Sequence, residues 1–307
     1  MSPNLLHALA GLRRLAPLGL VLAVTALVVP PATVHEDPAA LVRVERAHNV
    51  DMTPNVIWVL MLGSDARPGQ SVLRSRADAI QLVGINTRTG AATAIGIPRD
   101  SYVNIPGHGR SKINASMMYG GPELMARSVG DMVGIRPDYV FSTSFWGFSH
   151  MVDAIGGITV QSRYAFSDPL KPHGFRVGKN HVNGVQALVF ARIRKAFAGG
   201  DFTRSANQQR AMLGILNQVR RNADKPGFME RGVMSVLNNM ATPNMGPAEV
   251  YRLAQAAARV NPNRFRTCVV GGSTGYAGAA SVVFPNIGQA RSIAGRARKD
   301  ATLEGSC

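Results

Sequence analysis

The chain has 307 residues, of which 34 are Lys or Arg and 18 are Asp or Glu, so its formal net charge is +16. Apolar residues make up 46% of the chain and charged residues 17%, which is enough apolar material for a large core and excludes wholesale disorder. The two cysteines exclude a four-cysteine zinc site and a disulfide-dense small domain, but leave room for one disulfide. A charge this positive predicts an anionic partner, such as nucleic acid, lipid headgroups or an acidic polymer.

The first element expected from the sequence is an uncharged stretch at residues 15–34. As a helix, it spans about 30 Å, the hydrocarbon thickness of a bilayer. An arginine pair precedes it and an acidic pair follows it, which predicts a short cytoplasmic N-terminus at residues 1–14 and an extracytoplasmic location for the rest. A cleaved signal peptide is the alternative, but no clear Ala-x-Ala site is present, so we favour a single-pass transmembrane signal anchor in the cell membrane.

Residues 35–54 are polar and without periodicity, and we expect a linker there. The extracytoplasmic domain is then expected at residues 55–307. Its first strand is expected at residues 55–62, where a continuous apolar run ends in Gly63-Ser-Asp65.

Strands and helices are expected to alternate along the rest of the chain. Further strands are expected at residues 78–86, 91–97, 138–145, 158–161 and 264–270, the first two joined by a hairpin turn at residues 87–90. Helices are expected at residues 122–133, 146–155, 185–193, 203–222, 226–239, 247–260 and 287–298. Apolar strands that alternate with helices predict an α/β fold in which helices cover both faces of a sheet.

Three acidic residues lie at or beside predicted strand ends, each with an arginine within two positions. The acids are Asp65, Asp78 and Asp100, and the arginines are Arg67, Arg76 and Arg99. If neighbouring strands bring these ends together, carboxylate oxygens surrounded by guanidinium groups form a site suited to a diphosphate ester with bound magnesium. The alternative is that each aspartate caps a turn or forms a surface salt bridge.

A second polar cluster occupies residues 192–210, which contain five basic residues and one acid. Arg192 and Arg194 are two positions apart, so they point the same way only on an extended segment, and we expect the preceding helix to end before them. Thr203 is expected to cap the next helix, which places Arg204 in a first turn whose N–H groups favour an anion. A solvated basic loop is the alternative.

A series of motifs, in their order along the chain, resembles a known family. The motifs are Leu62-Gly-Ser-Asp65-Ala-Arg67, Arg76-Ala-Asp78, Ile97-Pro-Arg-Asp-Ser101, Lys112-Ile-Asn114, Tyr119-Gly-Gly121, Asp153-Ala-Ile-Gly-Gly157, Asn183-Gly-Val-Gln-Ala187, Arg192-Ile-Arg194 and Asp201-Phe-Thr-Arg204. Over residues 55–220 this series resembles the LytR-CpsA-Psr domain. The resemblance implies a three-layer α/β/α sandwich with a mixed central sheet, preceded by one N-terminal transmembrane helix.

The resemblance also implies an activity. Members of the family are phosphotransferases of cell-wall assembly, which move a glycopolymer such as teichoic acid or arabinogalactan from a polyprenyl-diphosphate carrier to peptidoglycan through a phosphodiester bond. The implied partners are the polyprenyl-diphosphate-linked donor, the peptidoglycan acceptor and the membrane, with no nucleic acid. The implied cofactor is Mg²⁺, or Mn²⁺ in its place, and a pyrophosphatase side activity is a further expectation.

Site residues follow from the resemblance position by position. Asp65 and Asp78 match the metal-binding carboxylates. The expected catalytic residues are Arg99, Asp100, Arg192, Arg194 and Arg204. The expected substrate-binding residues are Arg67, Arg76, Lys112, Asp201 and Gln208. One departure from the pattern is Asn207, where many relatives have an arginine.

Apolar residues are expected to enclose the polyprenyl tail, although most of those near the motifs are expected to be core. The candidates are Met117, Met118, Met125, Met132, Met151, Val189, Phe190, Met212, Leu213, Leu216 and Val219. Outside the cytoplasm, Cys268 and Cys307 can form a disulfide, with two free thiols as the alternative. Two other functions fit the charge: a non-catalytic binder of polyprenyl-phosphate-linked glycans, and a nucleic-acid-binding transcriptional regulator, against which the predicted anchor and the 6% aromatic content argue.

Overall fold

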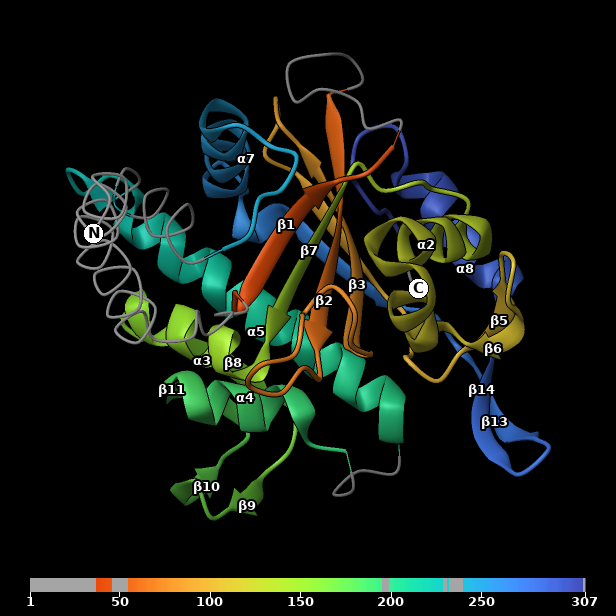
Figure 1. The fold of residues 1–307 in the computed structure, drawn as a ribbon. Helices are drawn as coiled ribbons and strands as arrows, with labels where there is room; N and C mark the ends of the chain where they lie inside the picture. The colour runs from red at the N-terminus through yellow and green to blue at the C-terminus, as the bar shows by residue number, and fades with distance from the viewer. Residues whose placement is uncertain (1–36, 46–54, 195–198, 229–230, 232–239, 306) are drawn as a thin grey trace, which may run out of the picture. The chain divides into compact units, whose positions relative to one another are not determined.

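The structure is a computed structural model that describes residues 37–45, 55–194, 199–228, 231, 240–305 and 307 (Figure 1). The predicted cytoplasmic segment and transmembrane anchor at residues 1–34 lie outside the described residues, as does most of the predicted helix at residues 226–239. Within the described ranges, no helix has both the length and the apolar character needed to cross a bilayer.

A six-stranded mixed sheet forms the centre of the domain, in the order β1-β7-β2-β3-β4-β12 (Figure 1). The strands are β1 (Ala39–Arg43), β7 (Tyr139–Ser144), β2 (Val56–Ser64), β3 (Ala77–Asn86), β4 (Ala92–Gly96) and β12 (Phe265–Val269). The pairs β7–β2 and β4–β12 are parallel, and the other three pairs are antiparallel. The predicted α/β fold with a mixed central sheet is therefore confirmed.

Strand β1 was not predicted and lies within the expected linker. Its five residues pair in antiparallel register with β7, from Ala39 opposite Thr143 to Arg43 opposite Tyr139. The linker prediction for residues 35–54 is wrong here, because Ala39, Ala40 and Val42 are buried and the strand completes the edge of the sheet. Five residues rich in alanine carry little strand propensity of their own, so tertiary pairing decides their structure.

Helices cover both faces of the sheet (Figure 1). On one face lie α2 (Ser116–Val133) and α8 (Ile287–Ala297), and on the other lie α5 (Gly200–Ala223) and α7 (Pro247–Ala258), with α3 (Phe145–Ala154) and α4 (Gly184–Arg192) beside α5. Leu60, Leu82 and Ile95 share one core with Met125 of α2 and Ile293 of α8.

The residues that alternate with these along the same strands point to the second face of the sheet and form its core. Val83 and Ala94 are buried there, and Met212 and Leu216 of α5 pack against them. The alternation along each strand thus divides its side chains between two helical layers.

The helix predicted at residues 122–133 is the second part of α2. Gly120 and Gly121 interrupt α2, and Gly121 has a φ of 63°, in the left-handed region that glycine adopts without strain. Pro122 follows the interruption, where its fixed φ suits the first turn of a helix. The motif Tyr119-Gly-Gly121 is therefore a kink between two helical segments.

Four small antiparallel pairs lie outside the central sheet, and their strands are mostly short, polar or exposed, so the sequence pattern did not reveal most of them. They are β5 (Tyr102–Ile105) with β6 (Gly109–Lys112), β8 (Ile158–Ser162) with β11 (Gly178–Val182), β9 (Phe166–Asp168) with β10 (Lys171–Phe175), and β13 (Gly272–Ala277) with β14 (Ala280–Pro285). β8 is the one strand of this group that was predicted, and it pairs with β11 rather than joining the central sheet.

A disulfide joins Cys268 of β12 to Cys307, closing a sequence separation of 39 residues. The Gln289 side chain of α8 donates a hydrogen bond to the carbonyl oxygen of Cys307 at 2.8 Å. The end of the described chain is thus tied both to the last strand of the sheet and to the helix that covers it.

Replacing Cys307 with serine is expected to lower the free energy of unfolding by about 4 kcal/mol, because the unfolded chain regains the entropy that a closed loop of this length removes. Guanidinium unfolding of oxidised wild type, reduced wild type and Cys307→Ser measures the effect. Reduced wild type is the matched control and is expected to match the variant. Equal stabilities of the oxidised and reduced wild-type proteins would contradict the prediction.

Candidate functional site

The polar clusters predicted from the sequence meet at one edge of the central sheet. Asp78 lies at the start of β3, and Arg99 and Asp100 follow the end of β4. These ends are neighbours because β3 and β4 are antiparallel, with Gln81 opposite Gly96. The guanidinium of Arg99 forms an ion pair with the carboxylate of Asp78.

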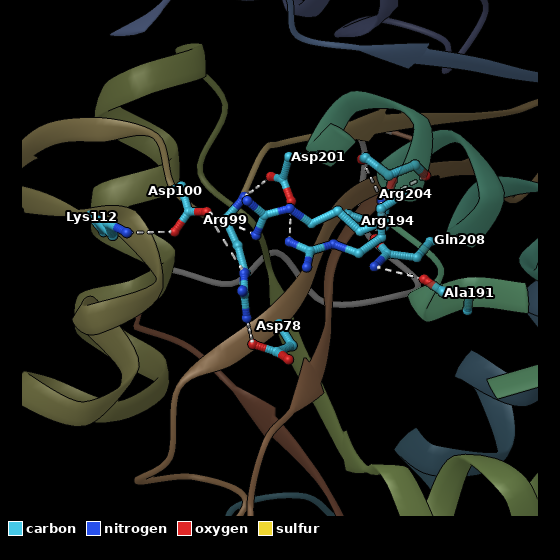
Figure 2. A network of polar contacts seen from close by, with 11 residues as sticks. Asp78, Arg99, Asp100, Lys112, Ala191, Arg194, Asp201, Arg204 and Gln208 are labelled. Atoms are coloured by element: carbon cyan, nitrogen blue, oxygen red, sulfur yellow. Dashed lines mark hydrogen bonds and ion pairs between the residues drawn. The ribbon is translucent and has the colours of Figure 1, made fainter. Parts of the chain in front are cut away.

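Asp100 lies at the centre of a group of cations (Figure 2). Its carboxylate is 3.0 Å from Nζ of Lys112, 3.9 Å from Nε of Arg99 and 4.0 Å from a terminal nitrogen of Arg194. Arg194 lies just beyond α4, which ends at Arg192 rather than before it as expected. One carboxylate thus separates three cations that would otherwise repel one another.

Asp201 and Arg204 form a second ion pair in the first turns of α5, where only 8% of Asp201 and 7% of Arg204 is exposed. The other carboxylate oxygen of Asp201 accepts a hydrogen bond from the backbone N–H of Arg99 at 3.1 Å. Burial raises the pKa of Asp201 and lowers that of Arg204, although each partner's charge opposes the shift of the other. The helix begins at Gly200, so the prediction that Thr203 caps it is wrong.

A chain of buried amides fixes α5 to the sheet, and most of it was not predicted. Nε2 of Gln81 donates hydrogen bonds to Oε1 of Gln208 at 3.1 Å and to the hydroxyl of Ser205 at 3.0 Å. Gln209 donates to Oε1 of Gln81 at 3.1 Å and to the carbonyl of Cys268 at 2.7 Å. The signal that could have revealed Gln81 is a polar residue on a strand that is otherwise apolar.

A cavity of about 860 Å³ opens beside this cluster. Its lining is mostly apolar and comes mainly from the sheet and from α3, α4 and α5. The charged lining residues are Asp78, Arg99, Asp168, Arg192, Arg194 and Arg204. The apolar lining includes Met61, Leu62, Phe141, Phe145, Phe148, Met151, Leu170, Leu188, Val189, Met212 and Ile215. The cavity can therefore hold a ligand that has a long apolar part and an anionic group.

Two arginines of the cavity, Arg192 and Arg99, differ in their surroundings. The guanidinium of Arg192 stacks over the ring of Phe145, with its central carbon 4.0 Å from the ring centroid. The buried Nε of Arg99 has no hydrogen-bond partner within the described part of the chain. A buried donor of this kind is costly to leave without an acceptor, which points to an anionic ligand at this place.

Some predicted residues lie outside the cavity. Arg67 and Arg76 are exposed, and the half-buried Asp65 donates its backbone N–H to the carbonyl of Arg76 at 3.0 Å. None of the three lines the cavity. Their roles as metal or substrate ligands stay predictions.

Asn207 also lies outside the cavity lining. The residue is 2% exposed, and its Oδ1 accepts a hydrogen bond from Arg210 at 2.6 Å. The departure at this position therefore changes a buried contact within α5 rather than the lining of the cavity.

Three of the apolar residues predicted to enclose the polyprenyl tail line the cavity. Met151, Val189 and Met212 line the cavity. Met117, Met125, Met132 and Phe190 are core residues. Phe145, Phe148 and Leu170 also line the cavity. They were not predicted, because their positions depend on how α3 and the β9–β10 turn pack.

Residues 32–299 of the chain match the LytR_cpsA_psr family. The protein therefore belongs to the LytR-CpsA-Psr family, as its ordered motifs implied. The match extends through the C-terminal strands and helix, well beyond the motif-bearing part at residues 55–220.

Two curated relatives illustrate the similarity. TagU of Bacillus anthracis, a polyisoprenyl-teichoic acid–peptidoglycan teichoic acid transferase, is 29% identical over 196 residues, which make up 64% of this chain and 62% of TagU. The probable cell wall biosynthesis protein LcpB of Corynebacterium glutamicum is 33% identical over 227 residues, covering 69% of this chain and 53% of LcpB. The chain thus spans between half and two thirds of the length of these relatives.

Solved structures share the fold. TagU of Bacillus subtilis superposes with a TM-score of 0.60 at 25% identity, covering 82% of this chain and 99% of TagU. TagT with bound octaprenyl pyrophosphate lipid superposes with a TM-score of 0.59 at 22% identity, covering 78% of this chain and 88% of TagT. At this identity, the similarity to TagT supports the fold alone.

Replacing Asp201 with asparagine is expected to lower the free energy of unfolding by about 3 kcal/mol, because Arg204 keeps a buried charge without its partner. The double variant Asp201→Asn/Arg204→Met is expected to recover most of that loss. Guanidinium unfolding measures both, with Asp131→Asn as the control, since Asp131 forms an exposed pair with Arg136 at 2.9 Å. Equal losses in the single and double variants would show that the buried charge is not the cause.

Proposed function

We propose that the protein is a phosphotransferase that moves a glycopolymer from a polyprenyl-diphosphate carrier to peptidoglycan, forming a phosphodiester bond. The observation that carries this proposal is the apolar cavity whose charged part is built from Arg99, Arg192, Arg194 and Arg204. A polyprenyl chain requires an apolar enclosure, and its diphosphate requires cations at one end of that enclosure. The name of TagU supports the same assignment.

Basic side chains outnumber acidic ones at the site, which suits an anionic ligand such as a diphosphate diester. The cations are Arg99, Lys112, Arg192, Arg194 and Arg204, and the carboxylates are Asp78, Asp100, Asp168 and Asp201. Arginine suits this role because its planar fork binds two phosphate oxygens at once.

In the proposed reaction, a sugar hydroxyl of the acceptor attacks the phosphorus atom that bears the glycan. The new P–O bond forms as the bond to the bridging oxygen breaks, and polyprenyl phosphate leaves with the electron pair. The arginines stabilise the charge that develops on this leaving group, in place and without rearrangement. The hydroxyl proton passes to a carboxylate, for which we propose Asp100, because Asp78 pairs with Arg99 and is also a proposed metal ligand.

Asp65 and Asp78 are the proposed ligands of Mg²⁺ or Mn²⁺. Their donor set fits, because the pairing of Gly63 with Ala79 and of Ser64 with Ala77 brings the two aspartates to the same edge of β2 and β3. No cluster of three or more metal-binding side chains occurs within the described ranges. Two carboxylates are nevertheless sufficient for magnesium, which completes its coordination with phosphate oxygens and water. A bound cation would neutralise charge on the diphosphate.

The proposed location is the outer face of the cell membrane, with the segment at residues 15–34 as the signal anchor. The disulfide between Cys268 and Cys307 supports an oxidising compartment. A non-catalytic glycolipid binder is the second candidate, since the same cavity would hold the same lipid without turnover.

Replacing Arg99 with alanine is expected to reduce transfer at least about a hundredfold, because a cation that acts on the developing charge is lost from the transition state. The measurement is release of polyprenyl phosphate, with formation of the glycan–peptidoglycan bond followed in parallel. Arg88→Ala is the control, since Arg88 is exposed in the turn at the opposite end of β3. Wild-type transfer by Arg99→Ala would contradict its role, and lipid binding without turnover by the wild type would favour the binder.

Removal of divalent cations with EDTA is expected to abolish transfer, and Mg²⁺ or Mn²⁺ is expected to restore it, because the diphosphate then recovers its neutralising charge. Asp65→Asn and Asp78→Asn are expected to raise the Mg²⁺ concentration needed for half-maximal rate. Asp131→Asn is the control, as an aspartate in a surface pair on α2. An undiminished rate in EDTA would exclude the metal from the reaction.

A further inference from the structure

The β5–β6 hairpin presents a polar and aromatic face beside the site. Tyr102 lies opposite Lys112 and Asn104 lies opposite Arg110, so these four side chains share one face of the hairpin. Val103 and Ile105 are buried on the other face. Lys112 connects this face directly to the site, because its ammonium group is 3.0 Å from the carboxylate of Asp100.

The β13–β14 hairpin adds an aromatic ring to the same face. Phe284 is 38% exposed, and its ring centroid is 6.2 Å from that of Tyr102 in an edge-to-face arrangement. The guanidinium of Arg110 lies 5.0 Å from the centroid of the Tyr102 ring. The N–H of Val283 donates to the carbonyl of Asp100 at 2.9 Å, which fixes this hairpin relative to the site.

These side chains have the chemistry that binds a saccharide. A sugar ring has apolar C–H faces that pack on aromatic rings, and a rim of hydroxyls that hydrogen-bond to amides and guanidinium groups. Phe284 and Tyr102 supply the rings, and Asn104 and Arg110 supply the polar groups. The cations Arg110 and Lys112 also complement the carboxylates of an acidic glycan.

We propose that this face, formed by Tyr102, Asn104, Arg110, Lys112 and Phe284, binds the acceptor glycan. The inference rests on the phosphotransferase function proposed above. It assigns a polysaccharide-binding surface to the protein, separate from the cavity proposed to hold the lipid.

The in-line geometry of the proposed reaction indicates that this face binds the acceptor glycan rather than the donor glycan. The attacking and leaving oxygens lie roughly in line through the phosphorus. The leaving polyprenyl phosphate occupies the apolar cavity, so the acceptor hydroxyl approaches from the opposite side of Arg99. Figure 2 shows Asp100 and Lys112 on one side of Arg99 and Ala191 and Gln208 on the other. Neither Asp100 nor Lys112 lines the cavity, whereas Gln208 does.

The test measures KM separately for donor and acceptor, using the purified full chain, a polyprenyl-diphosphate-linked glycan and soluble peptidoglycan oligosaccharides. Tyr102→Ala and Arg110→Ala are each expected to raise the acceptor KM about tenfold, which corresponds to about 1.4 kcal/mol of lost binding. The donor KM is expected to stay within about twofold of wild type, since such a change amounts to only about 0.4 kcal/mol. Tyr102→Phe is expected to retain the wild-type acceptor KM, because it keeps the ring.

Tyr276→Ala is the matched control. Tyr276 is 75% exposed, and its position in the β13–β14 register places it on the face of that hairpin opposite to Phe284. Its removal is expected to leave both KM values unchanged. Thermal unfolding of each variant checks that the hairpins remain folded.

Each outcome addresses one of the two proposals. Unchanged acceptor KM in folded Tyr102→Ala and Arg110→Ala would overturn the acceptor surface while leaving the phosphotransferase function intact. A rise in donor KM alone would assign the face to the donor glycan and likewise overturn the inference. Binding of donor by the wild type with no transfer to any acceptor would instead overturn the proposed function itself.

Discussion

The site depends on holding several arginines close together. Guanidinium groups repel one another, and the repulsion is strong where water is partly excluded. Three carboxylates offset this repulsion. Asp78 pairs with Arg99, and Asp201 pairs with Arg204. Asp100 lies among Arg99, Lys112 and Arg194. The acids thus make the cation cluster possible, and the excess positive charge is what an anionic ligand encounters.

Such a cluster needs a rigid support, and α5 provides it. Gln81 and Gln209 connect the helix to β3 and β12 through buried hydrogen bonds, which are strong because their alternative is an unsatisfied polar group. The same strand β12 carries Cys268, so the disulfide stabilises the part of the sheet against which α5 is held. Asp201 of α5 in turn accepts a hydrogen bond from the backbone N–H of Arg99, which ties Arg99 to the helix. The position of Arg99 is therefore fixed by buried hydrogen bonds that hold α5 on the sheet.

Much of this site could be predicted because its residues occupy ordered motifs and strand ends. The buried runs at residues 55–62 and 78–86 predicted two central strands, and their antiparallel pairing brings Asp78 beside the end of β4. The resemblance grouped Arg99, Arg192, Arg194 and Arg204, and all four line the same cavity.

What could not be predicted depends on pairing between distant segments. The strand at residues 39–43 has weak propensity and forms because β7 offers a partner. The cavity wall formed by Phe145, Phe148 and Leu170 arises from the packing of α3 and the β9–β10 turn, which no local pattern encodes. The β13–β14 hairpin is glycine-rich and exposed, so its strands lack the alternation that marks a half-buried sheet. Its contact with Asp100, through the N–H of Val283, joins segments that are far apart in the sequence.

The surfaces on the two sides of Arg99 differ in chemical character. On one side the central sheet and three helices enclose apolar space, which favours a ligand by removing its hydrocarbon surface from water. On the other side two hairpins leave aromatic and basic groups exposed, which suits a polymer that stays hydrated while it binds. In the proposed reaction, a diphosphate at the junction of these surfaces has its lipid and its attacking group on opposite sides of the phosphorus. The net positive charge of the chain is then only partly a general surface property, because the part proposed to act on the substrate is concentrated where the apolar and the hydrated surfaces meet.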